Sequence, residues 1–169
     1  MIRWVRSIAL TLALTTALTG SQAFAANAVI KVNAQPTKPL TLTRVQDLDL
    51  GTIVLAPGTW SGATISITRA GVFSCANTNT TCSGAPRVAT YTVTGSNSQV
   101  VRITAPNVTL TNQADPTKTL LLVVDSPGTI TLRNSGNKGS DFSLGGSIAL
   151  SSSTAGGLYA GTFDVTVDY

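Results

Sequence analysis

The chain lacks the side chains that most enzymes use to move protons at neutral pH. Histidine and glutamate are both absent from its 169 residues, and cysteine occurs only twice. General acid–base catalysis and the Ser–His and Cys–His nucleophilic pairs therefore lose their usual participants, and a zinc site would lack most of its ligands. The sequence predicts a protein that is not an enzyme and that needs no metal or cofactor.

Charged residues are scarce as well. They make up 11% of the chain, and the basic residues stand singly rather than in clusters. A nucleic-acid-binding protein needs a concentrated basic face, and attraction to an anionic membrane surface needs a polybasic segment. We therefore expect neither nucleic acid nor a membrane surface as a partner.

Asp47 and Asp49 are the closest pair of carboxylates in the chain. Their separation of two residues places both on one face of a strand. They are interpreted as solvated turn residues, because a cation site needs further acidic ligands and none lies nearby in the sequence. A paired-carboxylate site is the alternative.

The N-terminus has the pattern of an export signal. Basic residues open the chain, an apolar run follows over 7–20, and Ala23-Phe24-Ala25 supplies a small-x-small cleavage site. The run is shorter than the roughly 20 residues that span a bilayer. We predict a signal peptide at 1–25 and one domain at 26–169, exported to the periplasm, the cell surface or the medium, with no membrane span after cleavage.

The two cysteines, Cys75 and Cys82, enclose the polar stretch 76–81. In an oxidising compartment this spacing predicts one structural disulfide that closes a small loop. A redox pair is the alternative, although it would favour the tighter Cys-x-x-Cys spacing that lowers a thiol pKa.

The rest of the chain is typical of an all-β protein. Val, Ile, Thr, Leu and Tyr fill its apolar segments, and Pro and Gly interrupt them at short intervals, which predicts an antiparallel sandwich or barrel. In the last stretch Phe163, Val165 and Val167 alternate with polar residues, as in a half-buried strand. Strands are expected at 28–34, 40–45, 51–55, 63–68, 88–94, 100–105, 108–111, 120–124, 129–132, 147–151 and 158–168.

Three local patterns yield further predictions. The continuous apolar run 120–124 favours a strand covered on both faces, and Gly145-Gly146 reads as a tight turn. The polar, Gly-rich segment 134–141 predicts a hairpin connection or a binding loop.

Trp60 follows a Pro-Gly turn, where it either anchors a ligand or folds back over the sheet edge. An exposed Trp60 would form a candidate binding surface together with Asn137 and Lys138 of the Gly-rich segment.

Four stretches carry a resemblance to a known family. Residues 141–150 form an apolar strand with a Gly-Gly turn, and 157–169 contain Gly-x-Tyr-x-Gly followed by the alternating end strand; 48–53 and 88–95 match weaker features. This pattern resembles the secreted bacterial family called domain of unknown function 4402, over about 40–169.

The same C-terminal pattern is similar to that of spore-coat U-type and archaic chaperone-usher pilus subunits. That resemblance implies an immunoglobulin-like antiparallel β-sandwich at the cell surface, without catalytic residues. It further implies assembly by strand addition, in which one subunit's N-terminal extension fills a groove in the next. Identical or related subunits and a periplasmic chaperone would be the partners.

The sequence contains a candidate donor strand for such an assembly. Ala28, Ile30, Val32 and Ala34 share one face of the segment that precedes Pro36. The segment is equally well interpreted as the first strand of a complete sandwich. We expect a non-enzymatic, pilin-like surface subunit; the alternative is a monomeric extracellular binding module for glycan or an envelope protein.

Overall fold

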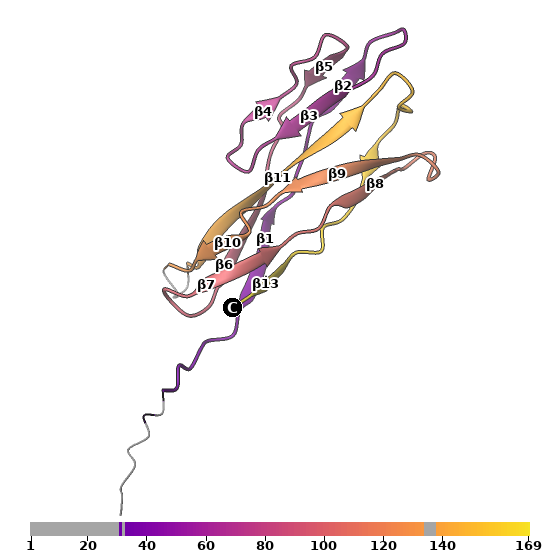
Figure 1. The fold of residues 1–169 in the computed structure, drawn as a ribbon. Helices are drawn as coiled ribbons and strands as arrows, with labels where there is room; N and C mark the ends of the chain where they lie inside the picture. The colour runs from indigo at the N-terminus through magenta and orange to yellow at the C-terminus, as the bar shows by residue number, and fades with distance from the viewer. Residues whose placement is uncertain (1–30, 32, 134–137) are drawn as a thin grey trace, which may run out of the picture. The chain divides into compact units, whose positions relative to one another are not determined.

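The computed structural model describes residues 31, 33–133 and 138–169, and the described chain is all-β (Figure 1). All its strands belong to one compact unit, Pro36–Tyr169, which is separate from the unit Met1–Gln35. None of the described segments is a helix of the length and apolarity that a bilayer crossing requires. The strands are β1 Thr41–Gln46, β2 Thr52–Leu55, β3 Ala63–Ile67, β4 Phe73–Ser74, β5 Thr80–Ser83, β6 Ala89–Thr94, β7 Val100–Thr104, β8 Val108–Asn112, β9 Thr119–Asp125, β10 Thr129–Thr131, β11 Ser140–Leu150, β12 Tyr159–Ala160 and β13 Thr166–Asp168.

Most strand predictions agree with these bounds, but the expected strand 147–151 is only the end of the longer β11, and the expected strand 158–168 is divided into β12 and β13. Of the first expected strand, 28–34, Ala28, Ile30 and Val32 lie outside the described residues, and Ala34 belongs to no strand. Two strands were not predicted, β4 and β5, because short Ser- and Thr-rich segments lack an apolar alternation.

The first part of the unit, residues 41–55, runs along residues 80–94. β1 pairs with β6, Asp49 bridges to Arg87, and β2 pairs with β5, all antiparallel. Both β1 and β2 are terminal strands of their sheets. Residues 41–55 therefore present a free backbone edge along their other side.

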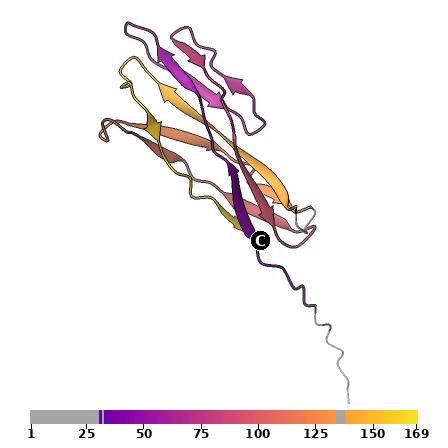
Figure 2. The same ribbon diagram turned by 180° about the vertical axis from the view of Figure 1, so that it is seen from behind.

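The last part, residues 159–168, runs along the stretch that contains β7 and β8. β12 pairs with β8 and β13 pairs with β7, again antiparallel, and both are terminal strands. The intervening residues 161–165 keep the alternating burial of a strand, yet they belong to no ladder. In the views from front and back, β13 ends beside the start of β1 (Figures 1 and 2).

β11 is the long strand that joins the two halves of the sandwich. Its residues 140–144 pair with β6, whereas 145–150 pair with β3 and β9. The predicted tight turn at Gly145-Gly146 is wrong, because both glycines lie inside β11 at this change of partners. A Cβ on Gly145 would meet the backbone of Ile67 and Arg69, so the close approach of β3 explains the glycine.

The core has two clusters between facing sheets, which defines an immunoglobulin-like antiparallel β-sandwich. In one cluster β6 and β11 pack against β7, and in the other β3, β8, β9 and β11 pack near β2 and β5. The prediction that 120–124 is covered on both faces is wrong: Leu122 is buried, but Leu121 and Val123 are 56% and 46% exposed. β9 is therefore a half-buried strand, although the residues on its exposed face are apolar as well.

Candidate functional site

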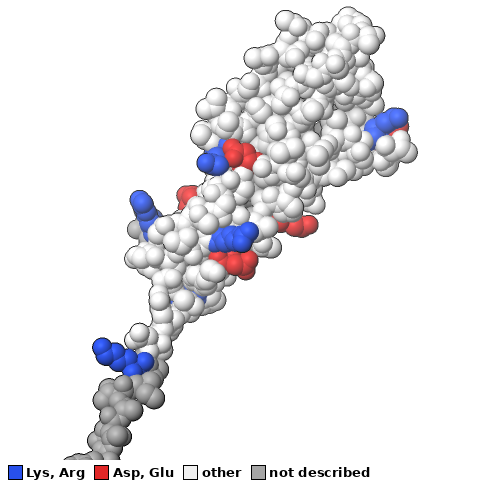
Figure 3. All heavy atoms as spheres, viewed as in Figure 1, with Lys and Arg blue, Asp and Glu red and all other residues white. Residues whose placement is uncertain are grey.

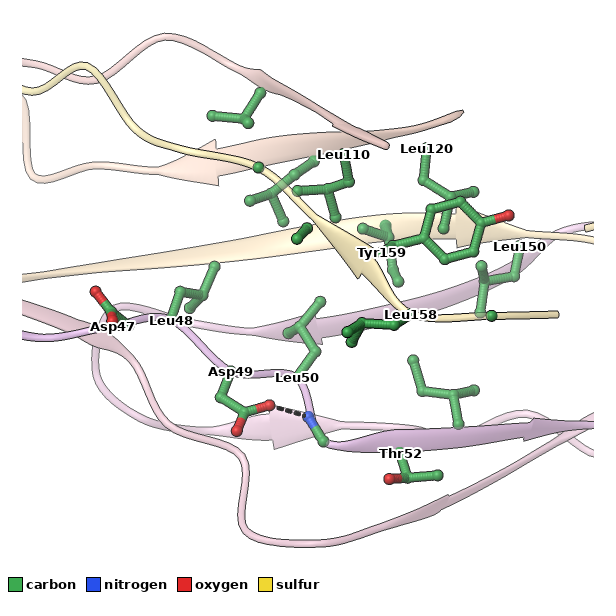
Figure 4. Close-up of a pocket in the computed structure, with 18 of the residues that line it drawn as sticks. Asp47, Leu48, Asp49, Leu50, Thr52, Leu110, Leu120, Leu150, Leu158 and Tyr159 are labelled. Carbon is green, nitrogen blue, oxygen red and sulfur yellow. Dashed lines mark hydrogen bonds between the residues drawn. The ribbon is translucent and has the colours of Figure 1, made fainter. Parts of the chain in front are cut away.

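An apolar groove of about 690 Å³ opens between the first and last parts of the sandwich. One wall comes from residues 44–55 and the other from residues 154–163, which arrive from opposite ends of the unit. Figure 4 shows leucine side chains from both walls and from β8, β9 and β11 converging on this space. The floor is formed by Val108, Leu110, Leu120, Leu122, Ile148 and Leu150.

Strand alternation makes the first wall apolar. Leu48, Leu50, Ile53 and Leu55 are partly buried and line the groove, whereas Asp49 and Val54 between them are exposed. Successive side chains of an extended chain point to opposite faces, so one face supplies the groove lining and the other meets water. On the second wall Leu158 is 72% exposed at the groove. Apolar side chains of both walls are thus left partly open to solvent at the groove.

Both walls also have unused hydrogen-bonding capacity. Each wall is paired with the sandwich along one side only. Among the described residues, no backbone–backbone hydrogen bond involves 161–165. The groove therefore combines an apolar floor with free backbone donors and acceptors on its two sides, which is the arrangement that an added strand requires.

Asp47 and Asp49 lie at one end of the groove, each beside an arginine. Arg44 Nη1 is 3.2 Å from Asp47 Oδ1, and Arg87 Nη2 is 3.8 Å from Asp49 Oδ2. Asp49 Oδ1 also accepts a hydrogen bond from the N–H of Gly51 at 2.8 Å, drawn dashed in Figure 4. All four ionic side chains are more than a third exposed, so each pair contributes little to stability. Within the described part of the chain, no three potential metal ligands come together.

Tyr91 forms part of the groove near the same end. Its ring stacks on that of Phe142 with centroids 5.4 Å apart. Burial raises the pKa of the Tyr91 hydroxyl, and the nearby negative charge of Asp47 adds to this effect, while Arg44 opposes it. The phenol is therefore neutral at physiological pH and acts as part of the groove lining.

Trp60 and Lys138, the two described residues of the candidate binding surface, do not lie together. The indole Nε1 of Trp60 donates to the carbonyl of Ala56 at 2.9 Å, and its ring packs against a core cluster. The Trp60 backbone is bonded to Ser152, just beyond the end of β11, whereas Lys138 precedes the start of that strand. An eleven-residue strand separates the two by about 35 Å. Asn137 lies outside the described residues.

The predicted disulfide joins Cys75 to Cys82. Cys82 lies in β5 opposite Ile53 of β2, and both cysteines pack against the core cluster next to the groove. The disulfide therefore fixes the position of β5, the strand that pairs with β2 of the first wall.

Charged side chains are sparse on the visible face of the molecule. Figure 3 shows isolated blue and red groups on a mostly white surface, with no gathering of basic residues there. The charged residues that line the groove are Arg44, Asp47 and Asp49, so its lining has no cluster of basic residues.

No single pattern in the sequence predicts this groove, although the segments on either side of it have strand patterns. Residues 48–55 place leucine or isoleucine at 48, 50, 53 and 55, and the last stretch alternates from Phe163 onward. Each pattern predicts a half-buried strand. The two segments border the same groove because strands far apart in the chain pair with each other.

These features define an all-β sandwich domain with an open apolar groove between its first and last strands. The family model described as Domain of unknown function (DUF4402) matches residues 40–169, so the chain belongs to that family. Searches of curated proteins and of solved structures found no match.

Proposed function

We propose that this protein is a non-enzymatic, exported surface subunit of the pilin type, which assembles by β-strand addition. The observation that carries the proposal is the groove: its first wall contains the end of β1 and all of β2, its second wall contains β12, each of these strands has one free edge, and its floor is apolar. An added strand would form main-chain hydrogen bonds along the walls and bury alternate side chains in the floor. The resemblance to spore-coat U-type and archaic chaperone-usher subunits agrees with this role.

The energetics favour occupation of the groove. A fully buried isoleucine or valine contributes about 1.5–3 kcal/mol from its apolar surface. An added strand could insert two such side chains and also cover Leu158. The apolar surface buried in this way would stabilise the complex by several times the thermal energy, and backbone hydrogen bonds would add to that. The N-terminal signal pattern predicts export. An exported subunit would meet other copies of itself and a periplasmic chaperone, and the chaperone would occupy the groove before assembly.

The test is a set of variants in the N-terminal segment, expressed in the native host. Deletion of 27–35 should abolish the ladder of polymers on an unheated SDS gel, while the protein stays soluble and retains a β-sheet circular dichroism spectrum. Ile30→Asp should have the same effect because it places a charge in the apolar floor. Val29→Asp is the matched control, since Val29 belongs to the opposite face of the segment. Polymers that survive the deletion contradict the proposal.

The second proposal, a monomeric binding module, has weaker support. Its expected residues, Trp60 and Lys138, lie at opposite ends of β11. A glycan ligand would also be poorly matched to an apolar groove. A ligand-dependent change in Trp60 fluorescence across a glycan panel would favour the module, and the absence of any change would count against it.

A further inference from the structure

We infer that the outer face of the sheet formed by β3, β11, β9 and β8 is a self-complementary lateral contact, through which polymers of this chain pack side by side. The partner of this face is the same face on a second copy, in a neighbouring polymer. The inference rests on the proposed function, because it requires polymers, but it concerns a surface that strand addition does not use.

The outer face lies on the opposite side of the sheet from the groove. Leu120 and Leu122 of β9 line the groove, and successive side chains of a strand leave opposite faces of its sheet. Leu121 and Val123 therefore point away from the groove, where they are 56% and 46% exposed. A strand that is added in the groove leaves both side chains uncovered, so each subunit of a polymer still presents this face to solvent.

The two apolar side chains stand at the centre of a face that is lined by hydroxyl groups. β9 lies between β8 and β11, and β3 pairs with the other side of β11 (Figure 1). Thr109 stands opposite Leu121, and Ser147 stands opposite Val123. The neighbouring outward residues are Thr64, Ser66, Ser74, Thr111, Thr119 and Ala149. An apolar centre within a polar rim is the usual anatomy of a protein interface.

The near absence of charge narrows the class of partner. On β3, β4, β8, β9 and residues 145–150 the face carries one charged side chain, Asp125 at its end, and Arg69 Nη1 lies 3.0 Å from Asp125 Oδ1. Nucleic acid and anionic lipid would need basic residues there. Two identical uncharged faces do not repel each other. A hydroxyl group both donates and accepts hydrogen bonds, so the rim can pair with its own copy.

The size of the face sets the strength of one contact. Its four strands lie about 4.8 Å apart, and five residues of each rise about 3.4 Å apiece, which gives about 320 Å² on each copy. A stable protein–protein interface buries about 800 Å² on each partner. Two free monomers should therefore not hold together, whereas two polymers repeat the contact along their length and gain avidity from it. The face becomes effective only after assembly.

The test compares polymers recovered from the native host and washed. Low-speed centrifugation pellets bundles and leaves single fibres in the supernatant. Leu121→Lys with Val123→Lys should raise the supernatant fraction at least about fivefold, because each contact would then bury unpaired charges. Val100→Lys with Thr104→Lys is the matched control, since it adds the same charge at exposed positions of β7, where Val100 is 57% exposed. The control should pellet like the unaltered protein.

A second variant removes the apolar centre without adding charge. Leu121→Thr with Val123→Thr should also raise the supernatant fraction, while threonine retains a high β-propensity. An increase in NaCl from about 0.05 to about 0.5 M should leave the unaltered bundles intact, because salt screens ion pairs and this contact contains none. Bundles that dissolve at the higher salt concentration would contradict an apolar contact.

The outcomes separate this inference from the proposed function. If the unaltered protein forms no ladder on an unheated SDS gel, the proposed function fails and the inference fails with it. If the ladder forms but the polymers do not pellet, or the β9 variants pellet like the control, the lateral contact alone is overturned. A second protein present in the bundles in equal amount would also overturn it. Where the lysine variant forms no ladder, the threonine variant decides. Normal ladders with bundles lost only in the β9 variants establish the contact.

Discussion

The hydroxyl of Tyr169 joins the two ends of the sandwich by donating a hydrogen bond to the carbonyl of Lys38, 131 positions earlier. The same hydroxyl accepts a hydrogen bond from the N–H of Ser96 at 2.8 Å. The end of the last strand is thereby fixed beside the start of β1. Farther along, the first and last parts of the chain separate and the groove lies between them.

Tyr169→Phe should lower the free energy of unfolding by about 1 kcal/mol, because it removes both hydrogen bonds and keeps the ring. Urea denaturation followed by circular dichroism measures the change. An unaltered midpoint would show that the hydroxyl does not hold the two strands together.

Gly145→Ala should cost about 3 kcal/mol or more, because the new Cβ would meet Arg69 N at 2.6 Å and the backbone must move. Gly156→Ala is the matched control: a Cβ there has no atom within 4 Å, and alanine reduces the freedom of the unfolded chain. Thermal unfolding of both variants checks the prediction. Equal melting temperatures would contradict the close approach of β11 and β3.

Asn112→Ala should destabilise the protein by about 2–3 kcal/mol. Asn112 is 1% exposed, and its amide bonds the backbone of Ala114, Asp115 and Gly156 at 2.9, 3.3 and 3.0 Å. Because Gly156 lines the groove, the variant should also slow polymer formation. Gln113→Ala, at the exposed neighbouring position, should stay within about 0.5 kcal/mol in the same urea titration.

Removal of the disulfide with Cys75→Ala and Cys82→Ala together should cost about 2.5 kcal/mol, the chain-entropy value for so short a loop. Reduction of the unaltered protein should give the same loss, measured by urea denaturation. Reductant should have no effect on the double variant, and an effect there would point to a different cause.

Much of the fold could be predicted because it depends on local patterns. Alternation located β3, β6 and β10 to within a residue or two, and the spacing of Cys75 and Cys82 indicated their disulfide. The errors have a different origin. Gly145-Gly146 resembles a turn locally, but the close approach of β3 is a tertiary contact that single-sequence reasoning does not reveal. Leu121 and Val123 are apolar yet exposed, so composition alone suggested a covered face.

The groove was harder to predict than the strands. Its walls are separated by about a hundred residues, and their nearness follows from the pairings of β2 with β5 and of β12 with β8. Sequence reasoning instead directed attention to Trp60 because an aromatic residue beside a turn is a common binding anchor. In the structure the Trp60 ring packs on the core and its indole N–H is satisfied by Ala56.

The central claim is that the groove accepts a strand from another copy, and the protein recovered from its native cell surface tests this most directly. An unheated SDS gel, read beside an electron micrograph of the same sample, gives the result. We predict a ladder that collapses to one band on boiling, together with fibres in the micrograph. A single monomer band before heating and no fibres would contradict assembly by strand addition.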